Sequence, residues 1–245
     1  MIQQDYFYDK HYECQFCSTP FTSKKVRRNS QSVLKRDSDF CTYYKQQSAN
    51  PVLYTVQVCP NCGYAFTDQF LPVFSPLTKK RIHDNIFTKW TEKEFGLTRS
   101  IPEAIACFKL AGFTAELKNE AHSVKAGLYL RLAWLYRFLE NEQEEQRFLR
   151  MAAKEYEESY IHSDYVKGDK EMSEARILYL IGELFRRIGE FDKAIRYFGK
   201  TIELKDRTVE QGTIQMARDQ WQLAREEYKQ VREAEMLDSR EAAEA

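Results

Sequence analysis

The placement of proline is the sequence feature that most restricts how this chain of 245 residues can fold. Every proline lies in the first 102 residues, at Pro20, Pro51, Pro60, Pro72, Pro76 and Pro102. Residues 103–245 contain none and are rich in Ala, Leu, Glu, Lys and Arg. Because proline breaks helices and these residues favour them, this stretch can be helical almost throughout. The segment LPVFSPLTKK, with two prolines, marks a junction. We therefore predict a turn-rich module with short strands over residues 1–75 and helical repeats over 76–245, ending in a capping helix from about Val209 to Leu237.

Two CxxC pairs give the N-terminal module its clearest chemical signal. The pairs are Cys14/Cys17 and Cys59/Cys62, with 41 residues between them. Two residues between cysteines let both sulfur atoms point at one ion, and two such knuckles complete a tetrahedral four-thiolate zinc site. The run 52–58, VLYTVQV, has strong strand propensity and leads into the second knuckle. These features predict a small, β-containing, zinc-ribbon-like module with a long insertion and a structural zinc ion.

Other interpretations of the cysteines stay open at this point. The CxxC pairs could form a redox dithiol, although no βαβ pattern surrounds them. Cys41 is either a further ligand or a nearby thiol, and His11 is a weaker ligand candidate. Cys107 lies on an apolar helical face, which predicts a core position.

A local basic run occupies the insertion between the knuckles. Residues 21–36 carry no acidic side chain, and they include Lys24, Lys25, Arg27 and Arg28. A basic loop beside a zinc ribbon could neutralise several phosphates of a nucleic acid. Alternatively it is a solvated insertion. The whole chain carries 37 basic and 37 acidic side chains, so its overall field does not favour nucleic acid or acidic lipid.

The helical half contains an internal repeat. Residues 175–208 fit a tetratricopeptide repeat, in which a small residue on each helix allows close packing; the matching positions are Leu178, Ile181, Gly182, Phe185, Gly189, Ala194 and Phe198. An earlier copy shares the first helix through Tyr129, Leu132, Ala133 and Tyr136. Its second helix, around Phe148, Ala152 and Tyr156, looks displaced by a few residues. The pattern predicts a mainly α-helical chain built as a tetratricopeptide-like solenoid, with an irregular helical bundle as the alternative.

In such a solenoid, the first helices line a concave face that can bind a partner. The alignment places seven side chains there: Leu130, Trp134, Arg137, Arg176, Tyr179, Glu183 and Arg186. Arginine and aromatic residues are typical of binding hot spots and could hold an acidic or C-terminal peptide. Alternatively, Trp134 is buried between repeats and the arginines are ordinary solvated charges. Aromatic-rich helices could also support self-association.

Three strings together resemble a known bacterial family. They are RDSDFCTYY, NPVLYTVQVCPNCGYAF and YLIGELFRRIGEFDKAIRYF, and they look like the domain-of-unknown-function family numbered 2225. Cys14, Cys17, Cys59 and Cys62 match its cysteine pattern. The resemblance implies a bacterial cytosolic protein and supplies no activity.

The sequence favours a binding protein over an enzyme. It contains no HExxH, GxSxG, Walker loop or GxGxxG motif, and four cysteine ligands would close a zinc site. The N-terminus lacks an apolar signal segment and no stretch is long enough to span a bilayer, so we expect a cytoplasmic protein without membrane contact. We predict a non-enzymatic, zinc-stabilised adaptor for a protein or peptide partner. A nucleic-acid-binding protein and a thiol/zinc redox sensor are the alternatives.

Overall fold

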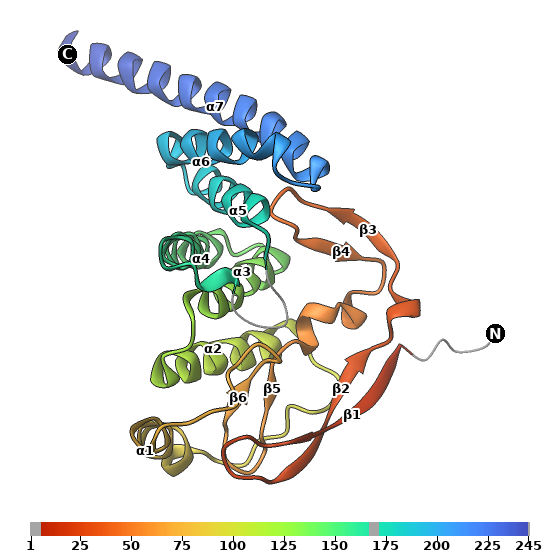
Figure 1. Cartoon of the computed structure of the whole chain (residues 1–245). Helices are drawn as coiled ribbons and strands as arrows, with labels where there is room; N and C mark the ends of the chain where they lie inside the picture. Colours follow the sequence, from red (N-terminus) through yellow and green to blue (C-terminus); the bar gives the residue numbers. More distant parts are fainter. Residues whose placement is uncertain (1–5, 167–171, 245) are drawn as a thin grey trace. The chain divides into compact units, whose positions relative to one another are not determined.

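The chain is mainly α-helical in a computed structural model that describes residues 6–166 and 172–244 (Figure 1). Seven α-helices lie in these ranges: α1 (Pro76–Asn85), α2 (Ile101–Lys118), α3 (His122–Phe138), α4 (Glu142–His162), α5 (Glu174–Arg187), α6 (Phe191–Glu203) and α7 (Gln211–Glu244). The expectation of a mainly helical chain with a small β-containing N-terminal part is confirmed at this level.

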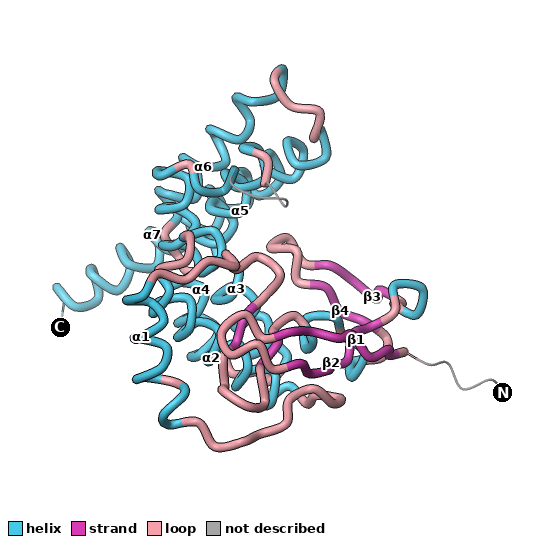
Figure 2. Tube along the Cα trace, turned by 60° about the horizontal axis from the view of Figure 1, so that its bottom comes forward, coloured by secondary structure: helices cyan, strands magenta, loops and turns pink. Residues whose placement is uncertain are grey.

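The strands form three separate two-stranded antiparallel hairpins before α1 (Figures 1 and 2). Their bounds are β1 (Phe7–Glu13), β2 (Pro20–Val26), β3 (Val33–Arg36), β4 (Thr42–Tyr44), β5 (Gln57–Val58) and β6 (Ala65–Phe66). In the first hairpin, the pairing runs from Phe7 opposite Val26 to Glu13 opposite Pro20. In the third, Gln57 pairs with Phe66 and Val58 with Ala65. The first and third hairpins therefore each end in a tight turn that contains one CxxC pair.

The strand predicted over 52–58 is wrong for most of its length. Pro51–Tyr54 forms a 3-10 helix, and only Gln57–Val58 is a strand. Asn50 begins the helix because its side-chain oxygen accepts a hydrogen bond from the backbone N–H of Val52 at 3.0 Å. Pro51 occupies the first helical position, where its fixed φ is suited to a helix. These local signals outweigh the strand propensity of the residues that follow.

The basic run 21–36 is also more ordered than the predicted loop. Most of it belongs to strands β2 and β3, with a 3-10 helix over Arg28–Ser30 between them. β2 pairs along its whole length with β1, and β3 pairs with β4. The charged side chains therefore project from strands and from a short turn.

Contacts divide the chain into two compact units, residues 1–155 and 156–245. This division differs from the boundary predicted near residue 75. The reason lies in contacts between the hairpins and the segment before α2. The buried guanidinium of Arg99 donates to the backbone oxygens of Leu53 and Val56 at 3.1 and 2.7 Å and to the Ser23 hydroxyl at 3.3 Å. The N-terminal hairpins thus share one core with α1, α2 and α3.

Two helix pairs have the same internal spacing. Within the second unit, Gly189 turns the chain between α5 and α6 with φ of 82°, and the rings of Phe185 and Tyr197 stack 5.8 Å apart. Within the first unit, Glu140 turns the chain between α3 and α4 with φ of 55°. The rings of Tyr136 and Phe148 stack there at 5.6 Å. Tyr136, Glu140 and Phe148 lie 49 positions before Phe185, Gly189 and Tyr197, respectively. The second helix of the earlier copy is therefore not displaced, contrary to the sequence alignment.

Serine side chains begin three of the helices. Ser75, Ser100 and Ser173 accept hydrogen bonds from the backbone N–H three residues on, at the starts of α1, α2 and α5. At α2 the Glu103 carboxylate also accepts from the N–H of Ser100 at 2.8 Å, which completes a capping box. Among the described helices, none has the combination of length and apolarity needed to cross a membrane.

Candidate metal centre

The candidate metal centre is built from two turns with the same backbone geometry. In the first turn, Cys14 N–H donates to Thr19 O, and Ser18 N–H donates to Cys14 O. In the second, Cys59 N–H donates to Tyr64 O, and Gly63 N–H donates to Cys59 O. Both turns need a left-handed residue directly after the second cysteine, and Ser18 and Gly63 have φ of 57° and 71°. Each CxxC pair is therefore held in place by bonds that span only five residues.

The two turns bring their four sulfur atoms together, as the CxxC spacing predicted. Cys14 Sγ lies 3.5 Å from Cys62 Sγ, and Cys17 Sγ lies 3.7 Å from Cys59 Sγ. All four sulfur atoms lie within 4.8 Å of one another. A tetrahedron with metal–sulfur bonds of ~2.3 Å has edges of about 3.8 Å. The four cysteines are thus spaced so that they could bind one metal ion.

Burial protects most of this cluster. Cys14, Cys59 and Cys62 are buried, and only Cys17 is partly exposed. Next to Cys17, the Asn61 amide donates to Thr19 Oγ1 at 3.1 Å and approaches Cys17 Sγ at 3.6 Å. This cross-link between the turns steadies the one side of the cluster that water reaches.

The sulfur contacts also set the protonation of the thiols. Contacts with Cys14 and then Cys62 lower the pKa of Cys59 to about 2, whereas contact with Cys59 raises the pKa of Cys14 to about 12. The neighbouring thiols, first Cys14, likewise raise the pKa of Cys62. The lowered pKa of Cys59 favours a thiolate at that position, and a cation at the centre of the cluster would favour loss of the remaining protons.

Sequence reasoning missed the residue that covers the second turn. The indole N–H of Trp90 donates to Pro60 O at 2.6 Å, and its ring lies directly over Gly63. A β-carbon at Gly63 would come within 2.4 Å of that ring. Trp90 follows α1, 27 residues after Gly63, and no local pattern links the two.

A buried ion pair positions the chain that leaves the second turn. Lys118 and Glu120 pair at 2.5 Å with almost no exposure, the Lys118 ammonium donates to Leu71 O, and the Glu120 carboxylate accepts from Leu71 N–H at 3.2 Å. The Lys118 ammonium also lies 5.0 Å from the ring of Phe74, which contacts Tyr64 beside Cys62. No sequence pattern indicates that these two charges are buried.

The other proposed ligands lie outside the four-sulfur group. The group contains neither Cys41 nor His11. Cys41 is buried near the tip of the β3–β4 hairpin, where its N–H donates to Asp39 Oδ1 at 3.2 Å. Cys107 is fully buried on α2, which confirms the predicted core position.

The basic residues predicted to contact nucleic acid are divided between two environments. Lys24 pairs with Asp9 at 3.0 Å, and Lys25 donates to Tyr54 O at 3.0 Å. Arg27 and Arg28 are exposed, with the Arg27 guanidinium 5.6 Å from the ring of Tyr8. The two lysines thus make their contacts inside the first unit.

The residues predicted to line a partner groove are mostly enclosed. In the first unit, Leu130 is buried, the Trp134 indole donates to Asp39 at 3.1 Å, and Arg137 forms a two-point pair with Asp39 at 2.7 and 3.2 Å. In the second unit, Tyr179 and Glu183 are fully buried. Arg186 pairs with Glu183 and Glu227. Arg176 is exposed. Within each unit, most of these side chains are therefore buried or paired instead of lining an open face. The helical pattern could not predict this, because it does not show which side of a helix other segments cover.

Comparison with known proteins places the chain in a family. A family described as an uncharacterized protein conserved in bacteria (DUF2225) matches residues 7–224. The chain belongs to this family. A relative described as an uncharacterized protein of Borreliella burgdorferi is 25% identical over 195 residues, which cover 71% of this chain and 68% of the relative. No solved structure matches the chain. The matched range of this DUF2225 protein contains all four clustered cysteines and α1–α6.

Proposed function

We propose that this protein is a non-enzymatic, zinc-stabilised adaptor that binds a protein or peptide partner. The observation that carries the proposal is the convergence of four cysteine sulfur atoms, within 4.8 Å of one another, from the turns of two hairpins. The metal would hold the N-terminal hairpins together, and the helices would provide the binding surface.

The donor set and its surroundings favour zinc in a structural role. Four thiolates suit zinc, and a tetrahedral shell of four protein ligands leaves no position for a substrate. The buried setting of Cys14, Cys59 and Cys62 also suits a site that stabilises rather than reacts. Because such thiols persist in a reducing compartment, the proposal assigns the protein to the cytoplasm.

The repeated helix pairs support the adaptor part of the proposal. The α5–α6 pair has the close approach expected of a tetratricopeptide repeat, since a β-carbon on Gly182 would lie 2.8 Å from the Phe198 ring. The α3–α4 pair repeats its turn and ring stacking at the same spacing. Proteins built from stacked helical pairs commonly present extended surfaces to partners.

Metal content of the purified full chain tests the zinc site. We expect about one zinc ion per chain, as a four-cysteine structural site requires, measured by elemental analysis after exhaustive dialysis. Cys59→Ser should lower this content sharply. Cys41→Ser and Cys107→Ser are matched controls, since both residues are buried cysteines outside the cluster and should leave it unchanged. A wild-type chain without bound metal, or equal losses in all three variants, would contradict the proposal.

Affinity capture from the cell of origin tests the adaptor role. A tagged full chain should retain a stoichiometric protein partner with and without nuclease treatment. Captured material that disappears with nuclease would instead assign the protein to nucleic-acid binding, and the adaptor proposal would fail.

A further inference from the structure

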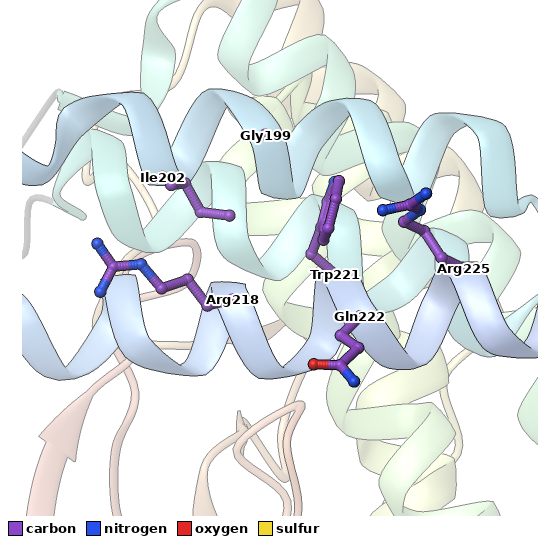
Figure 3. Close-up of a pocket in the computed structure, with 6 residues that line it drawn as sticks. All are labelled: Gly199, Ile202, Arg218, Trp221, Gln222 and Arg225. Atoms are coloured by element: carbon purple, nitrogen blue, oxygen red, sulfur yellow. The ribbon is translucent and has the colours of Figure 1, made fainter.

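An open groove runs between α6 and α7 within the second unit. Its main part has a volume of about 740 Å³ and is lined by Gly199, Ile202, Arg218, Trp221, Gln222 and Arg225 (Figure 3). A second part of about 460 Å³ continues from Arg225 toward Met236. In Figure 3, Trp221 and Arg225 rise from α7 toward α6, and Ile202 points back from α6. The groove is separate from the four cysteines, none of which lies in this unit.

Basic side chains follow the groove at regular intervals. Arg218, Arg225 and Arg232 lie seven residues apart on α7, and all three line it. Seven residues of helix span about 10.5 Å, so the guanidiniums form a row along one face. The structure pairs neither Arg218 nor Arg225 with a carboxylate of a described residue. Lys229 and Glu233 also line the groove, but they form an ion pair at 3.7 Å, so their charges cancel.

The floor of the groove is apolar. Trp221 is partly exposed with the Arg225 guanidinium 4.5 Å from its ring, and Ile195 and Ile202 lie on the α6 side. Gly199 keeps the middle open, because a β-carbon there would meet no atom within 4 Å. An aromatic ring beside arginine, in a cleft that a large side chain can enter, is the composition of an interaction hot spot.

We propose that the α6–α7 groove binds an acidic amphipathic helix of a partner protein. Carboxylates seven residues apart on that helix would lie opposite Arg218, Arg225 and Arg232, and large apolar side chains between them would pack on Trp221 and Ile202. This is the helix-in-groove mode of peptide recognition, with charge fixing the register. The inference rests on the proposed adaptor function and names the surface and the partner class.

The apolar floor favours a peptide over a nucleic acid. A nucleic acid would leave Ile195 and Ile202 without apolar partners.

Selection from a displayed peptide library tests the proposal on the full-length protein. The library holds peptides of about 15 residues, the length at which a helix becomes stable enough to bind as one, with leucine or phenylalanine at helical spacing and all other positions random. We expect enrichment of Asp and Glu at seven-residue intervals. The best peptide is then labelled, and its affinity is measured by fluorescence anisotropy at two salt concentrations.

Three variants separate the groove from general charge effects. Arg218→Glu combined with Arg225→Glu should weaken binding about tenfold or more, since each reversal places like charges together. Lys79→Glu combined with Arg81→Glu changes the net charge equally on the exposed face of α1 and should bind like wild type. Gly199→Leu should fill the groove and block binding while the helix stays folded, because nothing surrounds its β-carbon and leucine favours helix.

Each other outcome overturns the proposal in a distinct way. The groove would not be an acidic-peptide site if the selected peptides lacked acidic enrichment. The same would follow if the Arg218/Arg225 and Lys79/Arg81 double variants bound the peptide equally. Binding of a single-stranded DNA oligonucleotide that the groove variants alone abolish, without any selected acidic peptide, would assign the groove to nucleic acid. A dimer that only these variants dissociate would assign it to a second copy of the chain. Acidic peptides that bind every variant equally would leave the adaptor proposal standing and move its site elsewhere.

Discussion

Gly63 meets two separate requirements at one position. Its φ of 71° lies in the left-handed region, and the Trp90 ring occupies the place of a β-carbon. Ser18 stands at the same point of the first turn with φ of 57° and tolerates a side chain. The two turns are therefore alike in backbone but differ in how closely another residue covers them.

Substitution at these two positions should have opposite effects. Gly63→Ala should destabilise the first unit by about 1–2 kcal/mol for the left-handed backbone and by a further ~1–3 kcal/mol for overpacking against Trp90. Ser18→Gly should instead stabilise it by up to ~1 kcal/mol, because glycine adopts this conformation without strain. Urea unfolding followed by tryptophan fluorescence measures both changes. A loss limited to the backbone cost would show that Trp90 does not cover the turn in solution, and a Gly63→Ala chain as stable as wild type would also contradict the left-handed backbone.

The buried thiol of Cys107 gives a pH-dependent prediction. Burial raises its pKa to about 11, while an unfolded thiol titrates near pH 8.5. Between these values the folded chain keeps a proton that the unfolded chain loses, so stability falls as the pH rises. From pH 8 to pH 10 the free energy of unfolding should drop by about 2 kcal/mol from this group alone.

Cys107→Ala removes this contribution and keeps the tyrosines that also titrate at high pH. Its unfolding free energy, measured by urea at both pH values, should therefore decline less steeply than that of wild type. Parallel declines would mean that Cys107 is not buried as a neutral thiol.

The sequence was most informative about residues whose chemistry is local. Cys14, Cys17, Cys59 and Cys62 could be identified because two-residue spacing itself implies convergence on one point. The roles of Trp90 and Arg99 could not, because their partners Pro60 and Leu53 lie 30 and 46 residues away. Burial in the fold, rather than residue type, decides such contacts.

At the scale of elements, the β3–β4 hairpin is attached to α3 by buried charge. Arg137 donates to Asp39, Asp37 and Glu145, and the Trp134 indole also donates to Asp39, which is fully buried. Burial lowers the pKa of Arg137, but the hydrogen bonds from the guanidinium to Asp39 and Glu145 raise it overall. The hairpin tip thus depends on one cation to keep its carboxylate buried.

Removal of that cation should loosen the hairpin. Arg137→Met leaves Asp39 buried without its charge partner, which typically costs about 3–5 kcal/mol. Hydrogen exchange of the β3, β4 and α3 amides should rise accordingly. Arg147→Met is the control, since Arg147 is exposed and its pair with Glu144 should contribute no more than ~1 kcal/mol. Equal exchange in the two variants would show that the ion pair does not hold the hairpin.

Element prediction succeeded where repetition and periodicity agreed. The α5–α6 pair follows its sequence pattern through Gly182, Gly189 and Phe198. The earlier pair was harder to align because Glu145 stands where Ala194 does in the second, so the small-residue signal is absent. The turn of the earlier pair also has Glu140 where the later pair has Gly189. Without a glycine there, the sequence did not indicate the left-handed φ of this turn.

At the scale of the whole molecule, the unit boundary determines which parts should respond to metal loss. The proline pattern predicted a break near residue 75, but Arg99 and Arg137 connect the hairpins to α2 and α3. Composition indicates which segments can form helices, whereas the division into compact units depends on contacts between segments that are distant in the sequence. Metal loss should therefore affect more than the first 75 residues.

Treatment with a strong zinc chelator should raise amide exchange over residues 7–66 and, more weakly, over α2 and α3. The amides of α5 and α6 should keep their protection, because they lie in the other compact unit. Hydrogen–deuterium exchange with mass spectrometry measures both regions in one sample. Uniform deprotection of the whole chain would contradict independent units, and no change after complete metal removal would contradict a structural metal.

The two cysteine turns affect how much conformational entropy the chain loses when it folds. Each turn is complete within a few residues, but together they join points 45 positions apart, from Cys14 to Cys59. An ion held by all four sulfur atoms would act as a reversible cross-link and remove about 4 kcal/mol of loop-closure entropy from the unfolded chain, by the estimate used for disulfides. The β3–β4 hairpin lies inside that loop, so its docking on Arg137 would begin from a chain already confined.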